Sequence, residues 1–403
     1  MVVLIDLIGS IREVCVEDTL QRALAMDVWR TVGLTRLADV TGLDHIGINT
    51  FVAVRPNAKC LTTSQGKGVT KELAKVSALM EAIEIWHAEE IRDPCLYGSY
   101  EELNRRHSIL DFVSLAQCSE FRVKDFTSIP MSWVEARDMW TGEQTFVPWS
   151  LCSVDYTRMR PEAAYLAGST NGLASGNSIE EALCHALFEV VERETESTFE
   201  TASPATRQID LSTISSVHIL SLLRACEAAG IAVYIYDMTL HIRIPTFCAI
   251  ICDCENSARN PGTFRGTGTH LSPEIALSRA LTEAIQSRVT VISGSRDDLS
   301  PEFYLNAHRQ FGPEMIRASS MAGTVSFQPR VEALPSSFPN WIREILGHLM
   351  DAGFCDASYV DLTNPDLGIP VVKVLVPGCR FDALNHVNRP RRRHIKQCES
   401  QFS

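Results

Sequence analysis

Three parts of the chain repeat one pattern of apolar and polar positions. Each opens with a glycine-rich stretch and continues into a long run in which apolar residues recur every three or four positions. This is the spacing that one buried face of a helix requires. The three parts cover residues 62–91, 167–197 and 265–294. The pattern therefore predicts a glycine turn followed by a long helix, three times over.

Other stretches are rich in β-branched and aromatic residues, a composition typical of strands. The expected strands are Thr50 to Val54, 230–239, 244–255 and 369–378, and a further helix is expected near 339–353. Strand-like and helix-like segments are thus mixed along the chain. This mixture predicts an α+β fold in which long helices pack on a mainly antiparallel β-sheet.

The composition agrees with a soluble enzyme that buries a large core. Of the 403 residues, 45% are apolar and 21% are charged, and the net charge of -12 argues against a nucleic-acid binder. No apolar run reaches the roughly 18 residues that suggest a membrane span. The N-terminus lacks the basic start of a signal peptide. We therefore expect a cytoplasmic protein.

The cysteines indicate a reducing compartment rather than a zinc site or a disulfide framework. There are 13 of them, an odd number, and no two are spaced as C-x-x-C; Cys252 and Cys254 are the closest pair. A structural zinc site needs such pairs, or one pair with histidines at a set spacing. We interpret most of the cysteines as small, buried, apolar residues.

Each of the three long helices has a stripe of polar residues among its apolar ones. Residues at i, i+4 and i+7 share one helix face, as in the first stripe, and offsets of 8 and 11 residues bring the members of the second stripe to one face. The stripes consist of Ser77, Glu81 and Glu84 on the first helix, of Glu181, Glu189 and Glu192 on the second, and of Arg279, Glu283, Gln286 and Arg288 on the third.

Two features argue against an ordinary solvated surface, although this is the commoner role of any single helical glutamate. Glu81 and Glu84 are spaced i and i+3, as are Glu189 and Glu192, and like charges at this spacing destabilise a helix by about 0.2–0.5 kcal/mol. Each acid pair also follows a glycine stretch, whose backbone N–H groups can approach a phosphate. Carboxylates from two helices suit Mg²⁺, so the pattern predicts a nucleotide–Mg²⁺ site. The candidate fixed positive charges are Lys67, Arg193 and Arg279.

This site would lack the common nucleotide-binding signatures, because the chain has neither a P-loop nor the kinase motifs. A di-iron site is the rival interpretation of these residues. Glu84 and His87 form the E-x-x-H motif of di-iron bundles, which need the motif twice. On the second helix His185 precedes Glu189, which is the wrong order. We therefore interpret His87 as a helix-surface or core residue.

At these residues the chain resembles the YcaO family over most of its length. Three motifs in a fixed order carry the resemblance. S-x-x-x-E-x-x-E-R is met by Ser77, Glu81 and Glu84; N-x-x-x-E followed by E-x-x-E-R is met by Asn177, Glu181, Glu189, Glu192 and Arg193; and a glutamine followed by an arginine falls at Gln286 and Arg288. Ile85 stands where the first motif has its arginine.

The resemblance implies an enzyme that binds ATP and Mg²⁺ in the YcaO fold. The residues that would hold the metal ions are Glu81, Glu84, Glu189 and Glu192. Those that would contact ATP are Ser77, Asn177, Glu181, Arg193, Gln286 and Arg288, with Lys67 added from its position alone. Because Ile85 replaces an arginine, Lys67 or another cation would have to supply one contact to ATP.

YcaO enzymes phosphorylate the oxygen of a peptide backbone amide after a nucleophile has attacked its carbon. They need no covalent enzyme nucleophile, and we assign none. External sulfide would give a thioamide, a neighbouring Cys, Ser or Thr side chain an azoline, and an amine an amidine. We favour thioamidation, with azoline cyclodehydration second. Residues 34–48 and 53–56 are similar to the branch that works beside a TfuA partner, and the proline-rich end of azoline-forming members is missing.

A third hypothesis is a non-catalytic accessory or scaffold protein. The retained acids argue against it, because buried charges are costly to keep.

The expected substrate is a ribosomally made precursor peptide or protein. Residues 1–34 are too short for a leader-binding domain, so a separate partner is expected, either TfuA-like or a leader-binding E1-like or ocin-ThiF-like protein. Family members often pair as homodimers, which the sequence neither supports nor excludes.

We divide the chain into an N-terminal segment of the YcaO core, 1–55, a catalytic domain, 56–385, and a basic C-terminal tail, 386–403, that we expect to be mobile.

Overall fold

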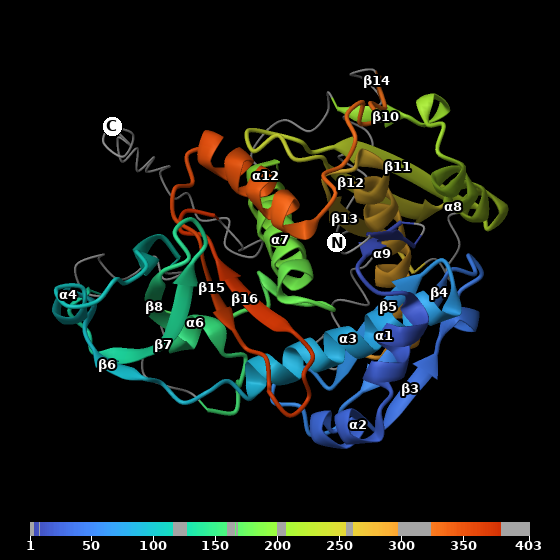
Figure 1. Cartoon of the computed structure of the whole chain (residues 1–403). Helices are drawn as coiled ribbons and strands as arrows, with labels where there is room; N and C mark the ends of the chain where they lie inside the picture. The colour runs from blue at the N-terminus through green and yellow to red at the C-terminus, as the bar shows by residue number, and fades with distance from the viewer. Residues whose placement is uncertain are drawn as a thin grey trace.

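The structure, a computed structural model, describes residues 4–7, 9–115, 127–158, 166, 168–199, 207–254, 261–296 and 324–379. The expected tail, 386–403, lies outside these residues. Within them, long helices pack on sheets that are mainly antiparallel (Figure 1). The predicted α+β fold is therefore confirmed.

The strands of the described residues form four sheets. They are β1 (Ile5–Asp6), β2 (Ile11–Arg12), β3 (Arg36–Asp39), β4 (Asn49–Val54), β5 (Thr63–Gly68), β6 (Leu96–Gly98), β7 (Met131–Asp138), β8 (Gln144–Pro148), β9 (Leu173–Ser175), β10 (Gln208–Asp210), β11 (Ile231–Asp237), β12 (Thr246–Asp253), β13 (Thr263–Thr269), β14 (Thr324–Ser326), β15 (Ser358–Asp361) and β16 (Val371–Leu375). The strand orders are β13-β12-β11-β10-β14, β6-β7-β15-β16-β9 with β8 beside β7, β3-β4-β5, and the pair β1-β2. Among these strands only β10 and β14 pair in parallel.

The helices follow the apolar periodicity of the sequence. They are α1 (Val16–Ala23), α2 (Met26–Val32), α3 (Lys71–Glu89), α4 (Tyr100–Leu103), α6 (Trp149–Cys152), α7 (Ile179–Phe199), α8 (Val217–Ala228), α9 (Pro273–Ser293) and α12 (Phe338–Asp351), with 3-10 turns η1 (Thr41–Leu43), η2 (Phe112–Leu115) and η5 (Leu211–Thr213). The three predicted long helices are α3, α7 and α9, and the fourth is α12. Each of the three long helices begins at a capping side chain. Thr70 accepts from the Leu73 N–H, Ser178 from the Glu181 N–H and Ser272 from the Ile275 N–H.

The predicted glycine turns before α3 and α9 are wrong, because both stretches are strands. Residues 65–68 lie in β5 and residues 265–268 in β13. A Cβ atom at Gly66 would lie 2.0 Å from the backbone nitrogen of Ala78 on α3, and one at Gly266 would lie 2.2 Å from that of Ala284 on α9. The glycines therefore let each strand pack directly against its helix. Close packing accounts for them without the predicted approach to phosphate.

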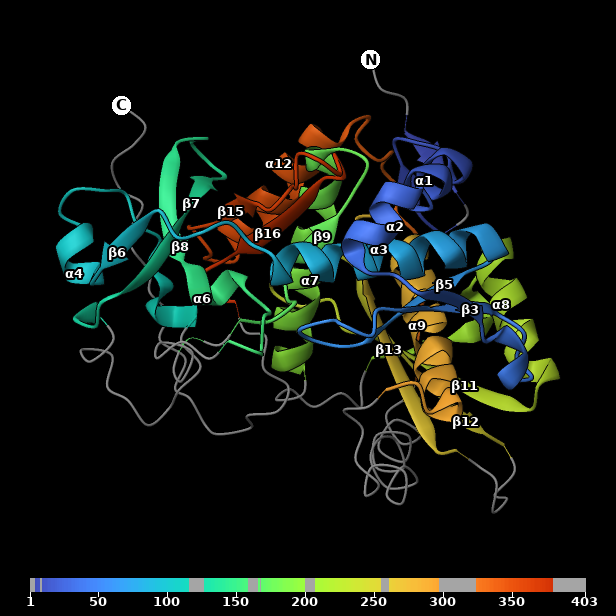
Figure 2. The same ribbon diagram turned by 90° about the horizontal axis from the view of Figure 1, so that it is seen from below.

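The central helix α7 lies between the two large sheets. It packs against β16 on one side and β13 on the other, and α12 covers its outer side (Figures 1 and 2). Helix α3 contacts β5 and β9, while α9 contacts β13 and β5. Most of α7 is buried, including the polar side chains of Glu181 and Glu192. The polar stripes of the long helices therefore point into the protein rather than into solvent.

Candidate functional site

Acidic residues of α3 and α7 lie close together inside the protein. Glu81, Glu84 and Glu189 are partly buried, and burial raises the pKa of Glu81 and of Glu189 to about 7. The pKa of Glu84 lies well above its usual value, because of burial first and then because of the negative charges of Glu189 and Glu81. Since such interactions weaken with distance, residues far apart in the sequence share one site. We call Glu81, Glu84, Glu189 and Glu192 the acid cluster.

Glu192 ties this cluster to the strand that precedes α9. Its side chain is buried, and its Oε1 accepts a hydrogen bond of 3.1 Å from the Thr267 hydroxyl on β13. Burial, and then the negative charge of Glu283 on α9, raise its pKa. The site therefore draws on all three long helices.

Cations surround the acids. Lys67 Nζ lies 3.1 Å from Glu283 Oε2. Although burial raises the pKa of Glu283, the charges of Lys67 and Arg193 hold it below its usual value. Arg193 lies 3.8 Å from Glu192 and donates to Glu196 at 2.8 Å. The positive charge of Arg279 also acts on Glu189 and Glu192. The three predicted cations, Lys67, Arg193 and Arg279, thus lie around the acid cluster.

The predicted ATP contacts Asn177 and Glu181 are bound to the N-terminal segment. Asn177 Nδ2 donates to Glu181 Oε1 at 3.1 Å, and its Oδ1 accepts from the Thr19 hydroxyl at 2.9 Å. Glu181 Oε2 also accepts from the Glu13 N–H at 3.1 Å, and its Oε1 lies 3.6 Å from the Arg12 guanidinium. Sequence reasoning missed Arg12 and Thr19, because no spacing in the sequence relates them to α7.

A second missed residue is Lys373 on β16, which is 1% exposed. Burial lowers its pKa to about 8, and the negative charges of Glu189 and Glu84 act in the opposite direction. The sequence offers one signal for it, a single lysine inside the apolar run 369–378, which predicts a strand.

Ser77 and Gln286 lie on the expected helices and are partly buried, whereas His87 lies in the core. Ser77 lies on α3 one turn before Glu81, and Gln286 lies on α9 one turn after Glu283. Both are partly buried. The rival metal ligand His87 is a core residue, 1% exposed, whose Nδ1 lies 2.7 Å from the Ile83 carbonyl oxygen.

Arg288, predicted as an ATP contact, is bound by two carboxylates. It is 2% exposed, and its Nε lies 3.1 Å from Asp44 Oδ2. Its other end donates to both oxygens of Asp253, at 2.7 and 3.3 Å. With its donors directed at two carboxylates, the guanidinium joins η1, β12 and α9. These ion pairs support a structural role for Arg288, and its contact with ATP stays a prediction.

The chemistry of the acid cluster fits Mg²⁺, although no complete cage is preformed. Among the described residues, no three His, Cys, Asp or Glu side chains converge closely enough to hold a metal ion as they stand. Mg²⁺ commonly takes one or two carboxylates and fills its other positions with phosphate oxygens and water. A divalent cation would also relieve the repulsion that raises the pKa of Glu84. The predicted ligands Glu81, Glu84, Glu189 and Glu192 thus suit a Mg²⁺ ion that arrives with a nucleotide.

Comparison with known proteins decides the family. The YcaO family model, described as a YcaO cyclodehydratase that binds ATP and Mg²⁺, matches residues 65–380. The chain belongs to the YcaO family. The predicted family and its cofactors, ATP and Mg²⁺, are thereby confirmed. YcaO enzymes are ATP-dependent and resemble cyclodehydratases.

One relative matches this YcaO protein over most of its length. It is 34% identical over 367 residues to an uncharacterized protein in the tfuA 3′ region of Rhizobium leguminosarum bv. trifolii, and the match covers 88% of this chain and 85% of the relative. The prediction that most cysteines are buried holds for fewer than half of the eleven in the described residues, namely Cys152, Cys184, Cys226, Cys248 and Cys379. No helix in the described ranges is long and apolar enough to cross a membrane.

Two solved structures share the fold. The structure of YcaO from Methanopyrus kandleri bound with AMPPCP and Mg²⁺ has a TM-score of 0.72 and 23% identity, and the match covers 94% of this chain and 95% of that one. A heterocyclase in complex with substrate and cofactor has a TM-score of 0.75 and 22% identity, and the match covers 92% of this chain. This YcaO protein spans about half, 53%, of the heterocyclase's length.

Proposed function

We propose that this YcaO protein uses ATP and Mg²⁺ to activate a backbone amide of a precursor peptide and convert it into a thioamide. The observation that carries the proposal is the acid cluster, in which partly buried carboxylates of α3 and α7 share one site with Lys67, Arg193 and Arg279 nearby. Buried like charges of this kind are costly unless a cation joins them.

The proposed reaction replaces the amide oxygen by sulfur. Sulfide attacks the amide carbon, and the resulting oxyanion takes the γ-phosphoryl group of ATP, with release of ADP. Phosphate then leaves with the former amide oxygen, and a C=S bond remains. Mg²⁺ supplies charge stabilisation during phosphoryl transfer. The protein's part is to hold the metal ions with the acid cluster and the phosphates with its cations.

The proposed residue roles follow the site geometry. Glu81, Glu84, Glu189 and Glu192 hold Mg²⁺. Ser77, Asn177, Glu181, Arg193, Gln286 and Lys67 contact ATP. Arg279, whose charge acts on Glu189 and Glu192, joins this set. Arg288 does not, because its donors are engaged by Asp44 and Asp253.

The relative from the tfuA 3′ region supports a TfuA-like partner and, with it, thioamidation. Azoline formation is the second candidate, because a heterocyclase shares the fold. At 22% identity this likeness supports the architecture rather than the product. We therefore keep thioamidation first.

Mass spectrometry tests the proposal. A candidate precursor peptide is incubated with this protein, ATP, Mg²⁺, sulfide and a TfuA-like partner, and its intact mass is measured. A gain of about 16 Da, with ADP formed in equal amount, is the expected result of sulfur replacing oxygen by activated-amide chemistry. A loss of about 18 Da would instead establish azoline formation.

The matched controls omit ATP, or use the Glu189→Gln variant, and both should leave the mass unchanged. ADP formation and modification that persist undiminished in Glu189→Gln would overturn the assignment of the site. If the wild-type protein binds no ATP while the partner still modifies the peptide, this protein is an accessory or scaffold protein.

A further inference from the structure

Lys373 stands in the middle of a strand whose five residues are all buried. It is 1% exposed. A buried ammonium ion is costly unless hydrogen bonds and opposite charges compensate it. A buried neutral side chain would fill a central strand position at lower cost. The lysine therefore calls for an explanation beyond packing.

The ammonium group is bonded to a turn. Lys373 Nζ donates to the carbonyl oxygens of Ser169 and Asn171, the second at 2.6 Å. Backbone hydrogen bonds hold the same turn, from Leu173 N–H to Thr170 O at 2.8 Å and from Val374 N–H to Gly172 O at 2.7 Å. The side chain of Lys373 thus fixes the point at which β9 begins.

This turn leads directly to a predicted metal ligand. Strand β9 pairs with β16, with Leu173 opposite Lys373 and Ser175 opposite Val371. At the end of β9 the Ser175 N–H donates a hydrogen bond of 2.8 Å to Glu84 Oε2. The ammonium group of Lys373 is therefore linked to the carboxylate of Glu84 by a hydrogen bond at each end and by the backbone from Asn171 to Ser175 between them.

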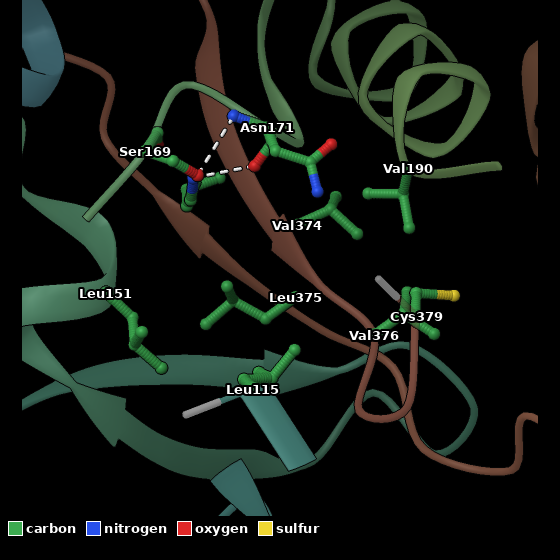
Figure 3. Close-up of a pocket in the computed structure, with 10 residues that line it drawn as sticks. Leu115, Leu151, Ser169, Asn171, Val190, Val374, Leu375, Val376 and Cys379 are labelled. Atoms are coloured by element: carbon green, nitrogen blue, oxygen red, sulfur yellow. Dashed lines mark hydrogen bonds between the residues drawn. The ribbon is translucent and has the colours of Figure 1, made fainter. Parts of the chain in front are cut away.

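The lysine end of this path is shielded from solvent, although Ser169 and Asn171 are only partly buried. Figure 3 shows Ser169 and Asn171 above a small cavity, with the apolar side chains of Leu115 and Leu151 on its other side. The cavity has a volume of about 20 Å³, and Lys373 is part of its lining. Hydrogen bonds in such a setting are electrostatically stronger than in water and costly to leave unmade. The turn therefore depends strongly on its lysine.

We propose that Lys373 is a positioning residue for the acid cluster: its hydrogen bonds fix the turn before β9, and β9 in turn holds Glu84 in place for the metal ion. The proposal rests on the proposed function, because it assumes that the cluster binds Mg²⁺. Groups that orient metal ligands in this indirect way typically account for about 10- to 100-fold in metal affinity.

A purely electrostatic role makes the opposite prediction. If Lys373 acted only as a nearby positive charge, it would repel an incoming Mg²⁺ ion, and its removal would tighten metal binding. Two neutral variants separate these roles. Lys373→Met removes both the charge and the donors, whereas Lys373→Gln removes the charge but keeps two N–H donors on a side chain one atom shorter.

The test measures binding of Mn²⁺, a stand-in for Mg²⁺, by electron paramagnetic resonance of the free ion, together with a non-hydrolysable ATP analogue. We expect Lys373→Met to weaken Mn²⁺ binding about 10-fold or more, and Lys373→Gln to weaken it less. Equal binding by wild type and both variants, or tighter binding by both, would overturn the proposal. If circular dichroism shows that Lys373→Met does not fold, the Mn²⁺ affinity of Lys373→Gln is compared with that of wild type instead. An unchanged affinity in Lys373→Gln would then overturn the proposal.

A matched control is Arg55→Met, which also removes a buried cation. Arg55 donates to the Val32 carbonyl and pairs with Glu89, and neither partner belongs to the acid cluster. It should lose stability while binding Mn²⁺ with an affinity within about twofold of the wild type. The result also separates the two hypotheses. A wild-type protein that binds no Mn²⁺ would refute the proposed metal site itself, whereas wild-type binding that is unaffected at Lys373 would refute only the positioning role.

Discussion

Two regions of this protein bury charge in different ways. At Arg288, one guanidinium lies between the carboxylates of Asp44 and Asp253, and at Arg55 a second pairs with Glu89. In the acid cluster, by contrast, no described residue forms an ion pair with Glu81, Glu84 or Glu189. Paired buried charges neutralise one another and serve the fold. A group of like charges is strained by itself and is suited to receive a cation.

The largest effect on activity is expected when one carboxylate of the acid cluster is neutralised. Glu189→Gln should lower ATP-dependent modification by about 1,000-fold, because the loss of a Mg²⁺ ligand removes roughly 4 kcal/mol of charge stabilisation. The thermal midpoint should stay the same or rise, because one of several repelling carboxylates is neutralised. Initial rates of ADP release and differential scanning calorimetry measure the two quantities. Activity within tenfold of wild type would contradict the proposed ligand.

Glu89→Gln is the matched control, because it neutralises a glutamate of the same helix α3 that is already paired. Glu89 is 4% exposed, binds Arg55 and accepts the N–H groups of Lys59 and Cys60, each at 3.0 Å. Breaking such a pair typically costs about 3–5 kcal/mol of stability. The rate per folded molecule should remain near that of wild type. Neutralising Glu189 would then lower activity, whereas neutralising Glu89 would lower stability.

Arg288→Met tests the paired region from its cationic side. It leaves Asp44 and Asp253 facing each other without their shared partner, and we expect the free energy of unfolding to fall by about 3 kcal/mol. Urea unfolding measures this loss. The KM for ATP should stay within about twofold of wild type if the role of Arg288 is structural. A large rise in this KM at unchanged stability would restore its predicted contact with ATP.

The sequence predicts the regular parts of this protein well and the strand–helix contacts poorly. Apolar periodicity located α3, α7, α9 and α12, because a buried helix face leaves a repeating signal. The glycines of β5 and β13 were misread as turns, since the need for glycine arose from Ala78 and Ala284 on the packed helices. Local sequence carries no record of such tertiary contacts.

The same limit applies to the site. Motif spacing pointed to the acids of α3 and α7 because the residues of one helix face recur at a fixed interval. Arg12 and Thr19 approach α7 from the other end of the chain, and Lys373 approaches it from a strand. Only the fold brings these segments together. Arg288 shows the reverse case, in which a motif position has partners that its spacing did not reveal.

A smaller effect concerns the pH dependence of stability, to which Glu189 of the acid cluster should contribute. Glu189 ionises near 4.5 when unfolded and near a pKa of about 7 when folded. Between these values the unfolded chain has already lost the proton that the folded protein keeps, so rising pH favours unfolding. Below 4.5 both states are protonated and there is no penalty, and above about 7 the penalty is constant.

Without Mg²⁺, Glu189→Gln should therefore gain stability over wild type as the pH rises through this window. We expect a gain of about 1–2 kcal/mol, after allowance for partial exposure and for coupling to its neighbours. Urea unfolding of both proteins at about pH 5 and about pH 8 measures it, and saturating Mg²⁺ with an ATP analogue should reduce or reverse the gain. A stability difference that is the same at both pH values would show that burial does not raise the pKa of Glu189.

The smallest effect is expected at the N-terminal segment, where a neutral hydrogen bond from Thr19 holds the predicted ATP contact Asn177. Thr19 is buried, and its hydroxyl donates to Asn177 Oδ1 at 2.9 Å, with the Cys15 carbonyl oxygen as a second acceptor at 3.1 Å; the bond to Asn177 orients the amide so that Nδ2 faces Glu181. Thr19→Val removes this hydroxyl at nearly constant volume. The loss of one such bond is worth about 0.5–1.5 kcal/mol, so the KM for ATP should rise about 2- to 10-fold.

Two controls make this small effect interpretable. Thr19→Ser keeps the hydroxyl and should keep the KM for ATP close to that of wild type. Thr246→Val removes an equally buried hydroxyl, on β12, that bonds to Ile244 and Thr269 instead, and it should change stability but not this KM. If Thr19→Val leaves the KM unchanged while Asn177→Ala raises it, Asn177 contacts ATP without help from the N-terminal segment. If neither variant raises it, Asn177 serves the fold, as Arg288 does, and the nucleotide site is confined to the cluster and its cations.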